Sequence, residues 1–180
     1  MEYQLYEILL LFSIYSILGW AAVGFLFALK GKGFINRGIC RGPYLMSFGI
    51  GALAVLQGSV FLETVFRLGS PQYFAGVFGL GLVAGLVLGL LSAAVCNGIS
   101  REKKVRFVWY HPILAGASAL ILVFHINYLV TAIIRAVSPW IHLIFLVIFF
   151  MRFLPETVDG LVSLWRLRKK ENISEEKRIR

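Results

Sequence analysis

Long uncharged runs of apolar residues, separated by short charged segments, are the dominant pattern along this chain. A helix needs about 20 apolar residues to cross the hydrocarbon core of a bilayer, and only helices or closed barrels satisfy their backbone hydrogen bonds there. Barrel strands would alternate apolar and polar residues over about ten positions, and these runs do not. The pattern therefore predicts an all-α polytopic membrane protein, a bundle of five transmembrane helices. The predicted spans are residues 8–29, 44–62, 73–99, 108–134 and 137–153.

The basic residues are sorted to one side of these five spans. Four lie between the first and second spans, four between the third and fourth, and eight at or after the end of the fifth. Only Arg67 and Arg135, of 18 bases, lie on the other side. The positive-inside rule makes the basic side cytoplasmic. We therefore expect a plasma-membrane protein with its N-terminus outside and its C-terminus in the cytoplasm.

Composition agrees with a bilayer as the solvent. Hydrophobic residues make up 59% of the 180 residues and charged residues only 15%, which is too little polar surface for a soluble domain of this size. The formal charge of +9 would suit nucleic acid only if the bases shared a binding face, and their sorting among loops argues against this. The first span has Glu2 and Glu7 before it and no base, so it is not a cleaved signal peptide.

The C-terminal residues form a second segment. We divide the chain into a transmembrane domain, residues 1–154, and a cytoplasmic amphipathic helix with a tail, residues 155–180. Pro155 suits the start of a helix. Four apolar residues then lie close to one helix face, and they are Val158, Leu161, Val162 and Trp165. This segment is predicted to lie on the inner leaflet, and the alternative is a helix that docks a partner.

The third span contains four small residues at a spacing of four: Gly81, Gly85, Gly89 and Ala93. This spacing places them on one stripe of a helix, where two helix backbones can approach closely. The stripe is predicted to pack against another helix of the same chain. Packing against a second subunit remains the alternative.

Few polar residues within the predicted spans offer chemistry. Glu63 lies at the outer end of the second span, four residues before Arg67, so it is either half of a helical ion pair or a cation or proton site. His125 and Asn127 lie inside the fourth span, where they either pack between helices or line a cavity. The sequence contains no catalytic or metal-ligand motif. It predicts no enzyme, no metal and no cofactor.

The segment between the first two spans is the most distinctive of the loops. Several glycines permit a tight loop there, and Asn36, Arg37 and Arg41 supply donors for a phosphate or a carboxylate. No phosphate-binding loop motif is present, so the chain has no ATP site of this kind. A lipid-modifying enzyme that uses these donors is a third hypothesis, and it lacks a catalytic group.

Four short motifs in the first third of the chain occur together, in order. They are Tyr15-Ser16-Ile17-Leu18-Gly19-Trp20, Gly33-Phe34-Ile35-Asn36-Arg37-Gly38, Gly42-Pro43-Tyr44 and Gly49-Ile50-Gly51-Ala52-Leu53. Over about residues 12–55 the chain resembles the ABC-transporter type IV family of small bacterial multi-span proteins. Val23 stands where that family has an acid, and the second half of the chain shows no counterpart of the later motifs.

The resemblance implies a set of motif residues and a function. Together with the loop donor Arg41, the motif residues are Gly19, Trp20, Asn36, Arg37, Gly38, Gly42, Pro43, Gly49 and Gly51. The function implied is a permease-like subunit, in a bacterial plasma membrane, of a transport system that works with a separate ATPase. The alternative is a non-transporting scaffold or regulatory subunit that holds a partner through its glycine stripe and C-terminal helix. The partners expected are the lipid bilayer and that other subunit, with no nucleic acid.

Overall fold

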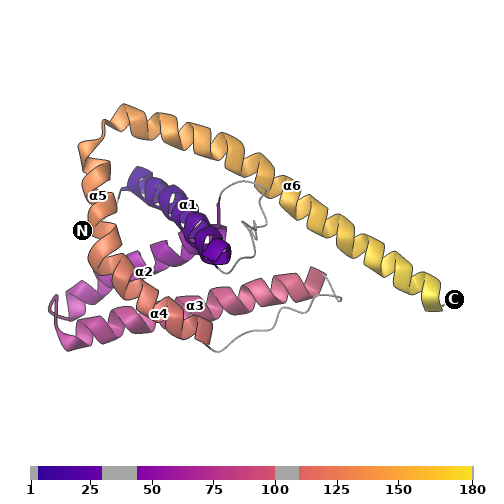
Figure 1. Cartoon of the computed structure of the whole chain (residues 1–180), viewed down its shortest axis with the longest axis horizontal. Helices are drawn as coiled ribbons and strands as arrows, with labels where there is room; N and C mark the ends of the chain where they lie inside the picture. Colours follow the sequence, from indigo (N-terminus) through magenta and orange to yellow (C-terminus); the bar gives the residue numbers. More distant parts are fainter. Residues whose placement is uncertain (1–3, 30–43, 100–109, 180) are drawn as a thin grey trace.

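A computed structural model describes residues 4–29, 44–99 and 110–179 of the chain. In these ranges every regular element is a helix (Figure 1). In chain order the elements are α1 (Leu5–Leu29), α2 (Met46–Val65), α3 (Pro71–Ile99), α4 (Tyr110–Ile121), the π-helical segment η1 (Leu122–Ile126), α5 (Asn127–Ala136) and α6 (Pro139–Ile179).

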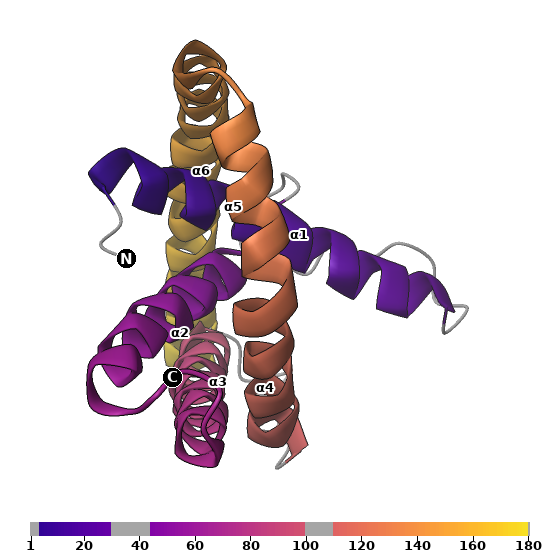
Figure 2. The ribbon, with the colours of Figure 1, turned by 90° about the vertical axis from the view of Figure 1, so that its left-hand side faces the viewer.

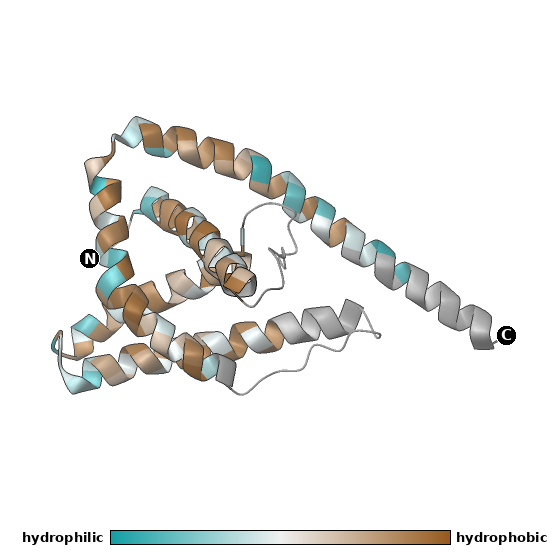
Figure 3. Cartoon of the chain, in the orientation of Figure 1, coloured by the Kyte–Doolittle hydropathy of each residue, from teal (hydrophilic) through white to brown (hydrophobic). Residues whose placement is uncertain are grey.

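Five helical segments are long and apolar enough to cross a membrane, as the sequence predicted. They are Leu5–Phe25, Met46–Val65, Pro71–Leu91, Pro112–Ala136 and Pro139–Ser163. The fourth combines most of α4 with η1 and α5, which follow one another without a break. Apolar residues predominate along these helices, as Figure 3 shows, and many of their large side chains are exposed. Soluble monomers rarely expose so much apolar surface, and these five helices have the length and composition of a multi-pass membrane protein.

A capping hydrogen bond or a first-position proline marks the starts of α1, α3 and α6. The N–H group of Gln4 donates to Oε2 of Glu7 (3.0 Å), which caps the first turn of α1. The N–H group of Tyr73 donates to Oγ of Ser70 (3.2 Å) at the start of α3. Both α3 and α6 have proline at their first position, where no backbone donor is needed. The third span consequently begins two residues earlier than predicted, and the fifth two residues later.

Three apolar clusters hold the helices together. The first joins α1, α2 and α5 around the buried side chains of Leu10, Leu11, Tyr15, Ala52, Leu56, Val130 and Ile134. The second joins α2, α3 and α4 around Val55, Tyr73, Val77 and Ala119. The third is aromatic and joins α1 to α6, with rings of Phe12, Tyr44, Phe149 and Phe153 packed mainly edge to face. Every element therefore contacts at least one of the clusters.

The sequence predicted a bundle of five helices without their crossing angles, and in the structure these helices cross one another. Figure 2 shows α1 lying across the direction of α4 and α5. Glycine permits the close approach of α1 and α2, because a Cβ atom at Gly19 would lie 2.7 Å from Cδ1 of Phe48. Likewise a Cβ atom at Gly49 would lie 2.8 Å from Cδ2 of Phe12. The chain connections between α2 and α3 and between α5 and α6 lie at the left of Figure 1, and the C-terminus lies at the right.

The predicted boundary at Pro155 does not separate two helices. α6 is one helix of 41 residues, Pro139–Ile179, and Pro155 lies inside it. Its length is roughly 60 Å at 1.5 Å per residue, about twice the thickness of the hydrocarbon core. If this helix spans the membrane, it continues well past the hydrocarbon core, and no second helix begins at Pro155 on the surface of the inner leaflet. Val158, Leu161 and Trp165 are exposed on this helix, and Nζ of Lys169 lies 5.5 Å from the centre of the Trp165 ring.

Candidate functional site

The fourth span changes its helical geometry in the middle. The N–H group of Asn127 donates to the carbonyl oxygen of Leu122, five residues earlier, which is the hydrogen bond of a π-helix. The backbone stays right-handed on both sides, at Ile121 and at Asn127, so the axis is not broken. Such wide turns are rare and occur often at functional sites. Two of the three polar residues predicted within the spans, His125 and Asn127, lie in or directly after this segment.

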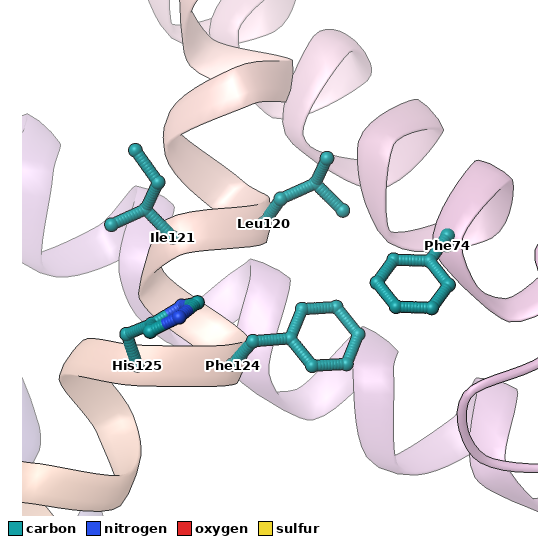
Figure 4. Close-up of a pocket in the computed structure, with 5 residues that line it drawn as sticks. All are labelled: Phe74, Leu120, Ile121, Phe124 and His125. Carbon is teal, nitrogen blue, oxygen red and sulfur yellow. The ribbon is translucent and has the colours of Figure 1, made fainter.

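A shallow hollow of about 420 Å³ lies beside the π-helical segment. Its lining comes from α3, α4 and η1 and consists of Phe74, Leu120, Ile121, Phe124 and His125 (Figure 4). The rings of Phe74 and Phe124 stack at 4.5 Å with an angle of 19° between their planes. The hollow thus has aromatic and aliphatic walls with a single polar group.

Asn127 joins α5 to α1. Its Oδ1 accepts a hydrogen bond of 3.2 Å from the hydroxyl group of Tyr15. The hydroxyl group of Thr131, one turn later in α5, donates to the backbone carbonyl oxygen of Asn127. Tyr15 is only 3% exposed and belongs to the first apolar cluster. The side chain of Asn127 therefore packs between helices, the first of the two alternatives left open by the sequence.

Glu63 has a different partner from the one that its spacing suggested. Its Oε1 accepts a hydrogen bond of 3.3 Å from the hydroxyl group of Tyr73, in the first turn of α3. The predicted helical pair with Arg67 does not form, because α2 ends at Val65 and the backbone is extended at Phe66. Tyr73 is 1% exposed, and its ring packs edge to face against Phe124 at 5.8 Å.

The three polar residues are thus held in three different surroundings. Glu63 and Asn127 are bonded to tyrosines from other helices, while His125 is exposed at the hollow. The sequence pointed to these three residues as polar groups within the spans. It pointed to Tyr15 only as part of a motif and not to Tyr73, because a tyrosine in an apolar run is typical of a core or an interface. The π-helical turn has no signal in the sequence, since neither glycine nor proline lies within residues 122–127.

Part of the motif set packs α1 and α2 together. Gly19 lies against Phe48, and Gly49 lies against Phe12 and Ser16. At Gly51 an added Cβ atom would lie 3.0 Å from Leu88 of α3. Trp20 is half-buried. The other motif residues, Asn36, Arg37, Gly38, Arg41, Gly42 and Pro43, lie outside the described residues.

The small-residue stripe of α3 packs within the chain at Gly81. A Cβ atom there would lie 2.7 Å from the carbonyl oxygen of Ala115 and 2.9 Å from Cα of Gly116, both in α4. The contact between α3 and α4 is the most extensive of the helix pairs. Gly85 and Gly89 are half-buried, and the side chain of Ala93 lies outside the described set.

A charged pair lies on α6 within the fifth candidate span. Nε of Arg152 donates to Oε1 of Glu156 at 3.1 Å, one turn further along the helix. Ile148, Met151 and Pro155 line a second hollow beside this pair. Across the described ranges, no three His, Cys, Asp or Glu side chains lie close enough to hold a metal ion.

No family model, curated protein or solved structure matches this chain. The resemblance over residues 12–55 therefore stays a prediction. What the protein does must be argued from the arrangement of its own residues.

Proposed function

We propose that this chain is a permease-like membrane subunit of a transport system whose ATPase is a separate protein. The observation that carries the proposal is the π-helical segment Leu122–Ile126 in the middle of the fourth span, with His125 exposed beside a hollow. Wide helical turns inside spans concentrate at functional sites, and polar side chains in spans mark substrate pathways. The resemblance over residues 12–55 agrees with this function.

The proposed topology places the N-terminus outside and the C-terminus in the cytoplasm. Two chain connections, α2 to α3 and α5 to α6, lie at one end of the molecule, opposite the C-terminal end of α6 (Figure 1). Both are outer connections in the five-span scheme. The extension of α6 would then reach into the cytoplasm, where an ATPase would bind.

The solute that suits this site is amphipathic rather than strongly polar. The hollow has four apolar lining residues and one imidazole, and Glu63 and Asn127 are engaged by tyrosines. An ion or a sugar would need more polar groups to replace its water. A lipophilic solute with one polar group would need only one such partner, and His125 supplies it.

A membrane scaffold is the second candidate function. It is favoured by the same engagement of Glu63 and Asn127, because groups that bond helices together do not form a polar path. The long α6 helix, with Val158, Leu161 and Trp165 exposed, would hold the partner.

Deletion of the gene, followed by measurement of cellular accumulation of amphipathic dyes, tests the transport proposal. The chain should also purify in mild detergent with a subunit that hydrolyses ATP. Unchanged accumulation together with no ATP hydrolysis in the purified complex would overturn it.

Labelling of single cysteines with a water-soluble maleimide separates the two candidates. Cysteines would replace Glu63, His125 and Asn127 one at a time, after Cys40 and Cys96 have been changed to serine. A transport path predicts labelling at His125 as well as at Glu63, and a scaffold predicts labelling at Glu63 alone, with Asn127 unlabelled in both cases because it packs between helices. Ile133→Cys, on the apolar outer face of α5, is the unreactive control.

A further inference from the structure

His125 is a polar side chain in an unfavourable place. It is the fourteenth of the 25 residues in the span Pro112–Ala136, and therefore lies near its middle. Its side chain is exposed, and within the described part of the chain it has no hydrogen-bond partner. Acyl chains cannot hydrogen-bond to an imidazole, so a lipid-facing histidine at this depth is costly and calls for a partner from outside the chain.

The surroundings of His125 suit a small molecule. The hollow beside it, about 420 Å³, falls in the range of about 300–1,000 Å³ that is typical of ligand sites. Ile121 and Leu120 supply its aliphatic wall, and the stacked rings of Phe74 and Phe124 supply its aromatic wall (Figure 4). One polar group among apolar walls is the usual design of a site that orients a lipophilic ligand.

We propose that this hollow binds a lipophilic molecule with an aromatic ring and one hydroxyl or carbonyl group, which enters from the bilayer. The ring would pack against the walls formed by Ile121 and Phe124, and the polar group would hydrogen-bond to the imidazole of His125. The inference deepens the proposed function and rests on it, because it assigns a ligand class to the same hollow, whether that ligand is cargo or a regulatory lipid.

A transmembrane helix of another subunit is the competing occupant. Helices pack in membranes through small residues that allow close backbone contact. The lining contains no glycine, alanine or serine, and its phenylalanines form walls instead. The lining therefore favours a small molecule.

Photolabelling of the full chain in lipid nanodiscs by 4-hydroxybenzophenone tests the proposal, because this probe carries a ring, a ketone and a hydroxyl group. The labelled residues are located by mass spectrometry and should lie in α3 and in the α4–η1 segment. Two competitors of the same shape are then compared. 4-Phenylphenol should displace the probe about fivefold better than biphenyl, which lacks the hydroxyl group, since one hydrogen bond contributes about 1 kcal/mol.

Three variants sharpen the test. Ile121→Trp fills the hollow and should abolish labelling, whereas Ile113→Trp, equally exposed on the same helix, should not. His125→Phe keeps a ring of similar size and should retain labelling but lose the preference for 4-phenylphenol. All three changes lie at exposed positions, and the elution volume and helical circular dichroism of each variant show whether it is folded.

Three results would overturn the proposal. The first is equal displacement by both competitors in the unmodified chain. The second is labelling that Ile121→Trp leaves unchanged. The third is efficient disulfide cross-linking between two copies that carry Ile121→Cys in the absence of Cys40 and Cys96, because another protein would then cover the hollow. These measurements need no ATPase and no transport, so their failure is separate from failure of the proposed function.

Discussion

The hydroxyl group of Tyr15 donates a hydrogen bond to Oδ1 of Asn127 across 112 residues of sequence. The bond joins the middle of α1 to the first turn of α5, directly after the π-helical segment. It therefore connects the π-helical segment of the fourth span to the first apolar cluster, which α1 shares with α2.

Loss of this bond should destabilise the protein measurably. Tyr15→Phe removes the hydroxyl group from a buried position and leaves the ring in place, so we expect a loss of about 1 kcal/mol. Unfolding in mixed micelles with a denaturing detergent measures it. Tyr128→Phe, at a side chain that is 78% exposed, is the control and should change stability little. A double-mutant cycle with Asn127→Leu should show a coupling of roughly 0.5–1.5 kcal/mol, and additive effects would contradict the bond.

Two glycines of α3 should respond oppositely to alanine. Gly81→Ala places a methyl group against the backbone of α4 and should cost about 1–3 kcal/mol, because neither helix can move without losing the contact. Gly79→Ala meets no atom within 4 Å and should be neutral or stabilising by up to about 1 kcal/mol. The same micelle unfolding assay compares them. Equal effects at the two positions would mean that α3 and α4 do not approach at Gly81.

α6 should remain one straight helix through Pro155. Spin labels at the exposed positions Ile144 and Val162 should be separated by roughly 27 Å along a straight helix, from 1.5 Å per residue. Pulsed electron paramagnetic resonance in nanodiscs measures this distance. A bend that laid the C-terminal part on the leaflet would shorten it to roughly 20 Å, from the same rise per residue. Labels at Ile141 and Leu154, both before the proline, provide the control pair.

The topology can be tested at two exposed positions. In a background without Cys40 and Cys96, a cysteine at Leu68 should react with a membrane-impermeant maleimide added to intact cells, because the α2–α3 connection is proposed to be outside. A cysteine at Trp165 should react only after the cells are opened. The opposite labelling pattern would reverse the orientation, and labelling of both positions in intact cells would rule out the five-span arrangement.

How far the sequence predicted the site depends on the range of each interaction. Glu63 was found because a charge near an apolar run is visible locally, but the only partner that the sequence suggested for an ion pair was Arg67, four residues away. The end of α2 at Val65 and the docking of Tyr73 decided otherwise. The spacing of small residues in the sequence pointed to Gly81, but only the fold shows which residues of α4 it contacts.

The sequence by itself determined the five spans and predicted their direction, because hydropathy and loop charge are sums over neighbouring residues. It also marked the polar residues within the spans. Only the tertiary structure decided the crossing of α1 over its neighbours, the tyrosine partners of Glu63 and Asn127, and the passage of α6 through Pro155. The physical reason is that these features depend on which distant helices meet, and a π-helical turn is chosen by that packing rather than by local propensity.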